Sequence, residues 1–322
     1  MEQLEGRIAV VTGGGTGMGR ELVRQLAAAG CDVATCDVSA EAMEETKALA
    51  LDGAPDGVRV VTFVADVSDE ALVLAFRDAV ASGLATEHVN LLFNNAGIGG
   101  GGSVIADDRT EWDRTFGVDW GGVYFGTRAF MPMLLAADEG HIVNTSSLNG
   151  LWASVGPQTP HTAYCAAKFA VRGFTEALIA DFRVNAPHLR ASVVMPGHVG
   201  TSIIINSGKA HGREPDKMDA GDLAKVRAQA ARNGLPVESI SDDDLRKGMK
   251  VMGEVFRDAA PTTAAQAATI ILDGVRANRW RIVVGEDAQK IDEAVRADPE
   301  HAYDVEFFAS LREAGVFVGL GG

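Results

Sequence analysis

Tyr164 and Lys168 lie four residues apart in a segment whose apolar residues recur with the spacing of a helix. Such spacing places both side chains on one helix face. A lysine ammonium beside a phenol favours the phenolate, so a tyrosine whose free pKa is about 10 can exchange a proton nearer neutral pH. The pair therefore predicts acid–base chemistry. Taken alone it is a weak indication, because tyrosine and lysine also meet at this interval on ordinary solvated helices.

Three segments that precede this pair strengthen the interpretation. They are a glycine-rich turn at residues 13–19, the run Asn-Asn-Ala-Gly at residues 94–97, and the serines Ser146 and Ser147 at the end of an apolar run. Each of these segments occurs in many proteins. Their order along one chain makes the combination specific.

The glycine-rich turn has the surroundings of a dinucleotide site. Residues 7–12 form a β-branched apolar run typical of a buried parallel strand, and a helical period resumes at residue 20. Glycines let the backbone approach a pyrophosphate, whose charge is met by the N-terminus of the following helix. A merely flexible turn would not need the flanking strand and helix.

Two carboxylates end the next strands and indicate how a dinucleotide would be held. Asp37 closes the strand at residues 32–37, at the distance where an acid can bond the adenosine ribose hydroxyls. Asp37 favours NAD. NADP needs a cation to bind its extra phosphate, but the turn carries the uncharged Thr16 and the residue after Asp37 is the uncharged Val38. Asp66 is expected to meet the adenine edge. A solvated strand end is the alternative for Asp37.

In this order the motifs resemble those of the short-chain dehydrogenase/reductase family, in its single-domain soluble branch. The resemblance runs from about residue 6 to residue 201 and resumes near Pro261. It implies that Tyr164 is the general acid or base, that Lys168 lowers the tyrosine pKa and holds the nicotinamide ribose, and that Ser147 orients the substrate oxygen. The cofactor-binding positions it implies are Gly13, Thr16, Gly17, Met18, Gly19, Asp37, Asp66, Val67, Asn94, Ala96, Gly97, Tyr164, Lys168, Pro196, Gly197, Val199 and Thr201.

The chain departs from the family pattern in two places. Asp119 stands where the family usually carries an asparagine that extends the catalytic proton relay, and a carboxylate cannot donate as the amide does. We count Asp119 among the catalytic positions and expect activity to be altered rather than absent. The second departure is a longer segment at residues 148–163, which should flank the substrate.

The candidate pocket walls are more apolar than charged. The expected walls are Trp152, Val155, Met195 and His198, and the expected substrate-binding residues are Ser147, Trp152, Tyr164 and His198. They favour an apolar alicyclic, aromatic or steroid-like alcohol or ketone over a sugar phosphate. Aromatic and methionine side chains also fill cores, which is the alternative for Trp152 and Met195.

The whole chain of 322 residues reads as one α/β domain with a doubly wound parallel sheet, a Rossmann fold. About seven buried strands are expected, at residues 7–12, 32–37, 58–65, 89–94, 140–146, 189–195 and 281–284. Residues 202–260 are charged, predict two helices, and are expected to form an inserted substrate lid. Residues 286–322 form a tail whose apolar side chains need cover, either on the chain itself or on a neighbouring subunit.

The composition argues against several classes of binding partner. A net charge of −15 and the lack of a basic stripe argue against nucleic acid. No apolar run approaches membrane-spanning length and no signal peptide precedes the first strand, so we expect a cytoplasmic protein that does not bind membranes. Its three cysteines fit free thiols, and its scattered histidines give no metal cluster. A homo-oligomer, dimer or tetramer, is expected.

These observations together favour an NAD-dependent oxidoreductase that interconverts a secondary alcohol and a ketone, with a small-molecule substrate. Two alternatives stay open. A dinucleotide-binding regulator without turnover has only Asp119 in its favour. An epimerase or dehydratase on the same sheet would convert its substrate with no net change in NADH absorbance.

Overall fold

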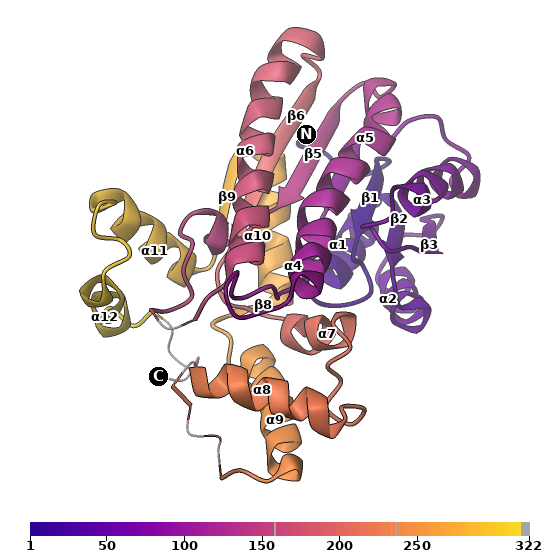
Figure 1. Ribbon diagram of the computed structural model, residues 1–322. Helices are drawn as coiled ribbons and strands as arrows, with labels where there is room; N and C mark the ends of the chain where they lie inside the picture. Colours follow the sequence, from indigo (N-terminus) through magenta and orange to yellow (C-terminus); the bar gives the residue numbers. More distant parts are fainter. Residues whose placement is uncertain (158, 233, 236, 238, 317–322) are drawn as a thin grey trace.

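The computed structural model describes residues 1–157, 159–232, 234–235, 237 and 239–316, and centres on a parallel sheet flanked by helices (Figure 1). The seven strands of this sheet have the order β3-β2-β1-β4-β5-β6-β9 and pair in parallel throughout. Their bounds are β1 (Ile8–Thr12), β2 (Asp32–Asp37), β3 (Val60–Val64), β4 (Leu91–Asn94), β5 (Gly140–Thr145), β6 (Leu189–Pro196) and β9 (Arg281–Val284). The predicted doubly wound fold is confirmed.

Helices cover both faces of the sheet, which is why its central strands are apolar on both sides. On one face lie α1 (Gly17–Ala28), α2 (Ala40–Asp52) and α10 (Ala264–Arg276). On the other lie α3 (Glu70–Gly83), α5 (Gly122–Leu135) and α6 (Thr162–Asn185). Every residue of β1, β4 and β5 is buried between these two layers. None of the helices in the described ranges is long and apolar enough to cross a membrane.

The strand order reverses next to β1, which pairs with both β2 and β4. At such a point the loops after adjacent strands diverge to opposite faces, which leaves a crevice at the carboxyl ends of the strands. The glycine-rich turn follows β1, the run at residues 94–97 spans the end of β4, and Ser147 follows β5. The topology therefore gathers at one edge of the sheet motifs that are far apart in the sequence.

The helix before α5 contains an irregular turn. Residues of α4 (Arg109–Phe116) continue into a π-helical turn, η1 (Gly117–Gly121), and then into α5. Asp119 lies in this turn and is completely buried. Single π-helical turns within α-helices often lie at functional sites, because they redirect one side chain out of the regular helical register.

The described residues of the segment expected to form a lid contain three helices, one more than predicted. They are α7 (Ile203–Ala210), α8 (Ala220–Arg232) and α9 (Asp242–Asp258), and they lie beyond the carboxyl edge of the sheet (Figure 1). A short ladder of β7 (Val199–Gly200) and β8 (Thr262–Thr263) closes the base of the segment. Met218, Leu223 and Leu245 form a small core of its own.

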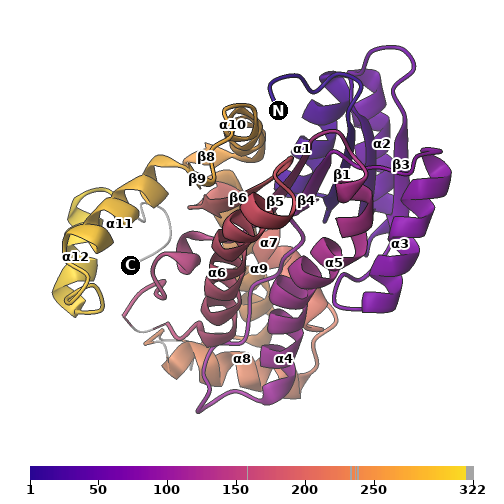
Figure 2. The same cartoon turned by 90° about the horizontal axis from the view of Figure 1, so that it is seen from above.

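The C-terminal helices α11 (Glu286–Ala297) and α12 (Val305–Glu313) cover the loop that follows β5 (Figure 2). Trp152, just after the short 3-10 helix η2 (Leu148–Gly150), is only 1% exposed. Its indole nitrogen donates to the Ala302 carbonyl oxygen at 2.7 Å, and its ring packs against Phe307. The described tail therefore finds its cover on the chain itself, whereas Phe317, Val318 and Leu320 of the tail lie outside the described residues.

Candidate active site

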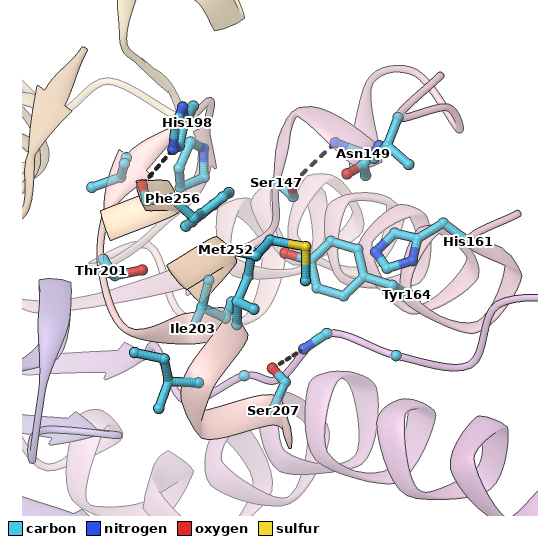
Figure 3. Close-up of a pocket in the computed structure, with 18 of the residues that line it drawn as sticks. Ser147, Asn149, His161, Tyr164, His198, Thr201, Ile203, Ser207, Met252 and Phe256 are labelled. Atoms are coloured by element: carbon cyan, nitrogen blue, oxygen red, sulfur yellow. Dashed lines mark hydrogen bonds between the residues drawn. The ribbon is translucent and has the colours of Figure 1, made fainter. Parts of the chain in front are cut away.

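A cavity of about 1190 Å³ opens at the carboxyl edge of the sheet, and its walls include residues of the C-terminal helices. Figure 3 shows the part of the cavity between the sheet and the lid segment. The sheet side contributes Ser147, Tyr164 and Lys168. The lid segment contributes an apolar patch of Ile203, Ile204, Ile205, Met252 and Phe256 to the opposite wall, and charged side chains beside it, among them Lys209, Arg213, Glu214, Lys217 and Lys250. The cavity thus carries the polar groups Ser147, Tyr164 and Lys168 on its sheet side, and an apolar patch with charged neighbours on its lid side.

Tyr164 and Lys168 come from the first turns of α6, and Ser147 comes from the end of β5. The Lys168 ammonium lies 5.3 Å from the centre of the Tyr164 ring. The Ser147 hydroxyl bonds the phenol and also accepts a hydrogen bond at 3.1 Å from the Asn149 backbone amide. The helix and the strand end therefore bring a phenol, a hydroxyl and an ammonium to one point on the cavity wall.

Lys168 is held by a buried acceptor set. Its ammonium donates to the Thr145 carbonyl oxygen at 3.3 Å and lies 3.7 Å from one carboxylate oxygen of Asp119. The other oxygen of Asp119 accepts from the Ile98 backbone amide at 2.8 Å. A side chain at Gly97 would meet both groups, at 3.0 Å from Asp119 and 3.1 Å from Lys168. A larger residue at this position would press on both members of the ion pair.

Lys168 was expected to lower the pKa of Tyr164, but burial and Asp119 have the larger influence on that pKa. Burial raises the pKa of the Tyr164 phenol above its usual value, the Asp119 charge raises it further, and the hydrogen bond with Ser147 lowers it by less. The positive charge of Lys168 is partly offset by its ion pair with Asp119. Without a bound cofactor, the structure therefore favours the protonated phenol.

Asp119→Asn should shift the pH–rate profile of the expected alcohol oxidation to lower pH. Burial raises the pKa of Asp119 to about 6, against the opposing charge of Lys168. At neutral pH the residue thus carries a charge that opposes phenolate formation, and a neutral amide lowers the Tyr164 pKa. The comparison needs kcat/KM across pH for both enzymes, with the exposed Asp273→Asn as control. Superimposable profiles for Asp119→Asn and the parent would show that its charge does not reach Tyr164.

The glycine-rich turn fits a dinucleotide pyrophosphate. The first helical residues of α1 have no side-chain cap from Thr16 and no acid in the first turn, so their amides are open to an anion. Gly13 has φ +70°, and a side chain there would lie 2.8 Å from the Ala96 Cα. A side chain at Gly19 would collide with the Gly13 carbonyl oxygen. Only glycine leaves the turn this close to the helix.

Asp37 lies at the end of β2 beside this turn. Its carboxylate accepts hydrogen bonds from the backbone amides of Gly15 at 3.0 Å and Ser39 at 3.1 Å. Arg20, a cation close to the turn, is held by the Gly15 carbonyl oxygen at 2.8 Å and by Glu45 at 2.6 Å. The acid is thus fixed at the edge of the turn while this cation is already paired.

Asp66 and Asn94 have partners that their motifs did not reveal. Asp66 forms a 2.7 Å ion pair with Arg114. Burial acts to raise the pKa of Asp66, but the hydrogen bonds from Arg114 and Ser68 together outweigh burial and lower the pKa below its usual value. Asn94 is 1% exposed and its amide bridges β4 to Thr127 at 3.1 Å and Asn144 at 2.8 Å.

Several predicted positions line the cavity, and two expected walls do not. Those at the cavity are Met18, Gly97, Ser147, Val155, Tyr164, Lys168, Pro196, Gly197, His198, Val199 and Thr201. Trp152 instead packs under the C-terminal helices, and Met195, within β6, is completely buried. Both serve as core residues. Strand alternation places Met195 on the same sheet face as Val193, where Leu151 covers it, and the tail covers Trp152.

Sequence reasoning missed several lining residues. Asn95, beside the predicted Asn94, reaches the cavity wall and is held by the Thr12 carbonyl oxygen at 3.1 Å. Asn149 and His161 line it from residues 148–163, the segment that was expected to flank the substrate, although neither was singled out as a substrate-binding residue. The lid residues 203–205 form an isoleucine triplet before a charged segment. That triplet was the signal available in the sequence for an apolar wall.

Comparisons with known proteins agree with this geometry. A family model described as short chain dehydrogenase matches residues 7–211. A protein named "Putative oxidoreductase SadH" from Mycobacterium tuberculosis (strain ATCC 25618 / H37Rv) is 34% identical over 297 residues, which cover 92% of each chain. Levodione reductase from Leifsonia aquatica is 33% identical over 68% of this chain and 79% of its own. A short chain dehydrogenase/reductase from Burkholderia phymatum, solved in complex with NAD, matches with a TM-score of 0.72 at 28% identity, over 93% of this chain and 96% of that chain.

Proposed function

The chain belongs to the short-chain dehydrogenase family, and on that premise we propose that it interconverts a secondary alcohol and a ketone with NAD(H). The observation that carries the proposal is the convergence of Ser147, Tyr164 and Lys168 on the wall of one cavity, at the strand edge that bears the glycine-rich turn. A phenol, a hydroxyl and an ammonium in this arrangement can bind and protonate a carbonyl oxygen.

In this proposal each residue has a distinct role. The Ser147 hydroxyl bonds the substrate oxygen, and Tyr164 gives a proton to that oxygen during ketone reduction or takes it during alcohol oxidation. Lys168, fixed by Asp119 and Thr145, holds a positive charge beside the phenol. When bound, the nicotinamide cofactor supplies or accepts the hydride. The raised pKa of Tyr164 keeps a proton available and supports reduction at neutral pH.

The lid wall supports an apolar substrate. Ile203, Met252 and Phe256 face the cavity across from the tyrosine (Figure 3). We propose that residues 202–260 act as a substrate lid and that the substrate is an alicyclic, aromatic or steroid-like alcohol or ketone. The relative named levodione reductase is consistent with a carbonyl substrate.

The cofactor should be NAD, with kcat/KM for NAD more than about tenfold above that for NADP. Asp37 is held beside the glycine-rich turn, and in this proposal it faces the ribose that carries the extra phosphate of NADP. Two like charges 4 Å apart repel by about 1 kcal/mol in water and by about 4 kcal/mol near a protein surface. Steady-state kinetics with both cofactors measure the preference. Asp37→Ala should lower the ratio of kcat/KM for NAD to kcat/KM for NADP. Asp52→Ala, at the exposed end of α2, should leave this ratio unchanged. A preference for NADP in the parent enzyme would contradict the assignment.

The test of the function is a screen of secondary alcohols and ketones followed at the NADH absorbance band. Oxidation of alcohols with NADH formation supports the dehydrogenase. Substrate conversion without net NADH change would identify the epimerase or dehydratase. Cofactor binding with no conversion across the screen would identify the regulator, against which the combination of Ser147, Tyr164 and Lys168 argues.

We also propose that the protein is a cytoplasmic homo-oligomer. An aromatic cluster of Trp120, Tyr124 and Phe174 lies on the outer side of η1, α5 and α6, with Tyr124 40% exposed. Self-association would cover this surface. Light scattering coupled to size-exclusion chromatography measures the subunit number.

A further inference from the structure

We propose that Asn149 and His161 form a polar subsite that binds a second hydroxyl group of the substrate, next to the carbon that reacts. The inference rests on the proposed function and narrows its substrate class. Both side chains line the cavity and flank the Ser147 and Tyr164 pair from the loop side (Figure 3). The lid side chain Met252 approaches from the other side.

Asn149 presents an acceptor to the cavity. Its side-chain amide nitrogen donates both to the Trp152 carbonyl oxygen at 3.1 Å and to the Ser154 carbonyl oxygen at 2.9 Å. These two bonds fix the orientation of the amide, because the carboxamide oxygen could not serve two carbonyl acceptors. No residue in the described part of the chain donates to that oxygen. An oxygen so oriented is complementary to a hydroxyl that donates a proton.

His161 adds a donor next to this acceptor. Its ring lies 4.8 Å from the Tyr164 ring, and it precedes α6 without capping the helix through its side chain. Neither ring nitrogen is bonded to any residue that the structure describes. Burial lowers the pKa of His161 to about 4, against the opposing charge of Glu111, so the imidazole is neutral near pH 7. A neutral imidazole offers one N–H donor and one nitrogen acceptor.

A hydroxyl group matches this pair better than other oxygen functions. It can donate to the Asn149 oxygen and accept from the His161 N–H, which satisfies both groups. A ketone oxygen would leave the Asn149 acceptor without a donor, and a carboxylate would be repelled by it. Because Ser147 and Tyr164 hold the reacting oxygen, the second hydroxyl belongs on a neighbouring carbon. The favoured substrates are therefore vicinal diols and α-hydroxyketones whose remaining surface is apolar.

The test compares cyclohexanol with cyclohexane-1,2-diol, both diastereomers, as substrates that differ only in the second hydroxyl. We expect the parent enzyme to prefer one diol diastereomer over cyclohexanol. His161→Phe keeps the ring and removes both nitrogens, so kcat/KM for the diol should fall about 10- to 100-fold while the value for cyclohexanol changes by less than about twofold. His161→Asn, which restores a donor and an acceptor, should recover part of the loss. Val155→Ala, another cavity-wall change, should affect the alcohol and the diol alike.

Two results would overturn the subsite. One is a parent enzyme with no preference for either diol. The other is an equal loss on alcohol and diol in His161→Phe with a shifted pH–rate profile, which would show that His161 acts on Tyr164 by packing. If the parent oxidises none of these compounds, the proposed function fails separately. Calorimetric titration of cyclohexanol and the diols into the enzyme with NAD then decides the subsite. His161→Phe must weaken binding of the preferred diol more than binding of cyclohexanol, whereas Val155→Ala must change the two affinities by the same factor.

Discussion

Tyr164→Phe should lower kcat by about two to four orders of magnitude while leaving NAD affinity close to that of the parent enzyme. The substitution deletes the proton donor and its bond with Ser147, and general acid–base groups typically contribute this much to a rate. The ring contact with His161 at 4.8 Å is kept, so the fold should not suffer. The measurement combines steady-state turnover of a substrate found in the screen with cofactor titration by fluorescence.

The matched control is Tyr124→Phe, the same chemical change on α5 outside the cavity wall. It should leave turnover within about twofold of the parent, as surface substitutions usually do. Turnover in Tyr164→Phe as high as in Tyr124→Phe would remove Tyr164 from the acid–base role. It would also leave the cavity without an assigned proton donor.

Lys168→Met should have the second large effect, because it should lower both the activity and the stability of the protein. The variant loses the ammonium that is expected to hold the cofactor, so NAD affinity and kcat should both fall. It also leaves Asp119 buried without its cation, and breaking a buried pair costs about 3 to 5 kcal/mol. Methionine keeps the length of the side chain, so the loss is mainly one of charge.

The stability of Lys168→Met should rise on acidification from pH 7 toward pH 5. Burial already holds the pKa of Asp119 at about 6, above its value in the unfolded chain, and Lys168 is the main influence that opposes this rise. Without the lysine the folded-state pKa is higher still. The native state then binds more protons than the unfolded state between the two pKa values, and its stability increases as pH falls through that window.

A second variant separates the fold from the chemistry. Lys168→Met combined with Asp119→Asn removes the unpaired charge, so denaturant unfolding should recover most of the lost stability and lose its pH dependence in this window. Turnover should stay low. Recovery of turnover in the double variant would mean that Lys168 serves only to neutralise Asp119. Unfolding midpoints and NAD-dependent turnover, measured on the same preparations, decide between the two outcomes.

The regular part of the fold could be predicted from local patterns. Each of the seven strands of the sheet is a short apolar run between turn residues, and burial on both faces requires such runs. The turn at residues 13–19 could also be assigned from the sequence, because only glycine permits a turn that close to a helix. The shared helix face of Tyr164 and Lys168 also followed from their spacing, because residues four apart share a face wherever the helix lies. The order of the preceding motifs made that pair specific.

Contacts between segments distant in the sequence could not be predicted. Trp152 reads as a pocket wall next to Ser147, but the C-terminal helices, which begin more than a hundred residues later, cover it. Asn94 and Asn95 are adjacent and identical in type. Asn94, the last residue of β4, bonds Asn144 in the core, whereas Asn95, just after the strand, is held by Thr12 and reaches the cavity. Whether these residues are buried or line the cavity depends on the segments that pack against them. The local sequence does not specify those segments.

The sequence by itself determined the doubly wound sheet, the glycine-rich turn and the identity of the groups available for acid–base chemistry. Their electrostatic balance was decided by the tertiary structure. Asp119 lies at a π-helical turn that brings its carboxylate to Lys168, so the acid offsets the very charge that was expected to act on Tyr164. A pKa depends on burial and on charges within a few ångströms, and these distances exist only once the chain has folded.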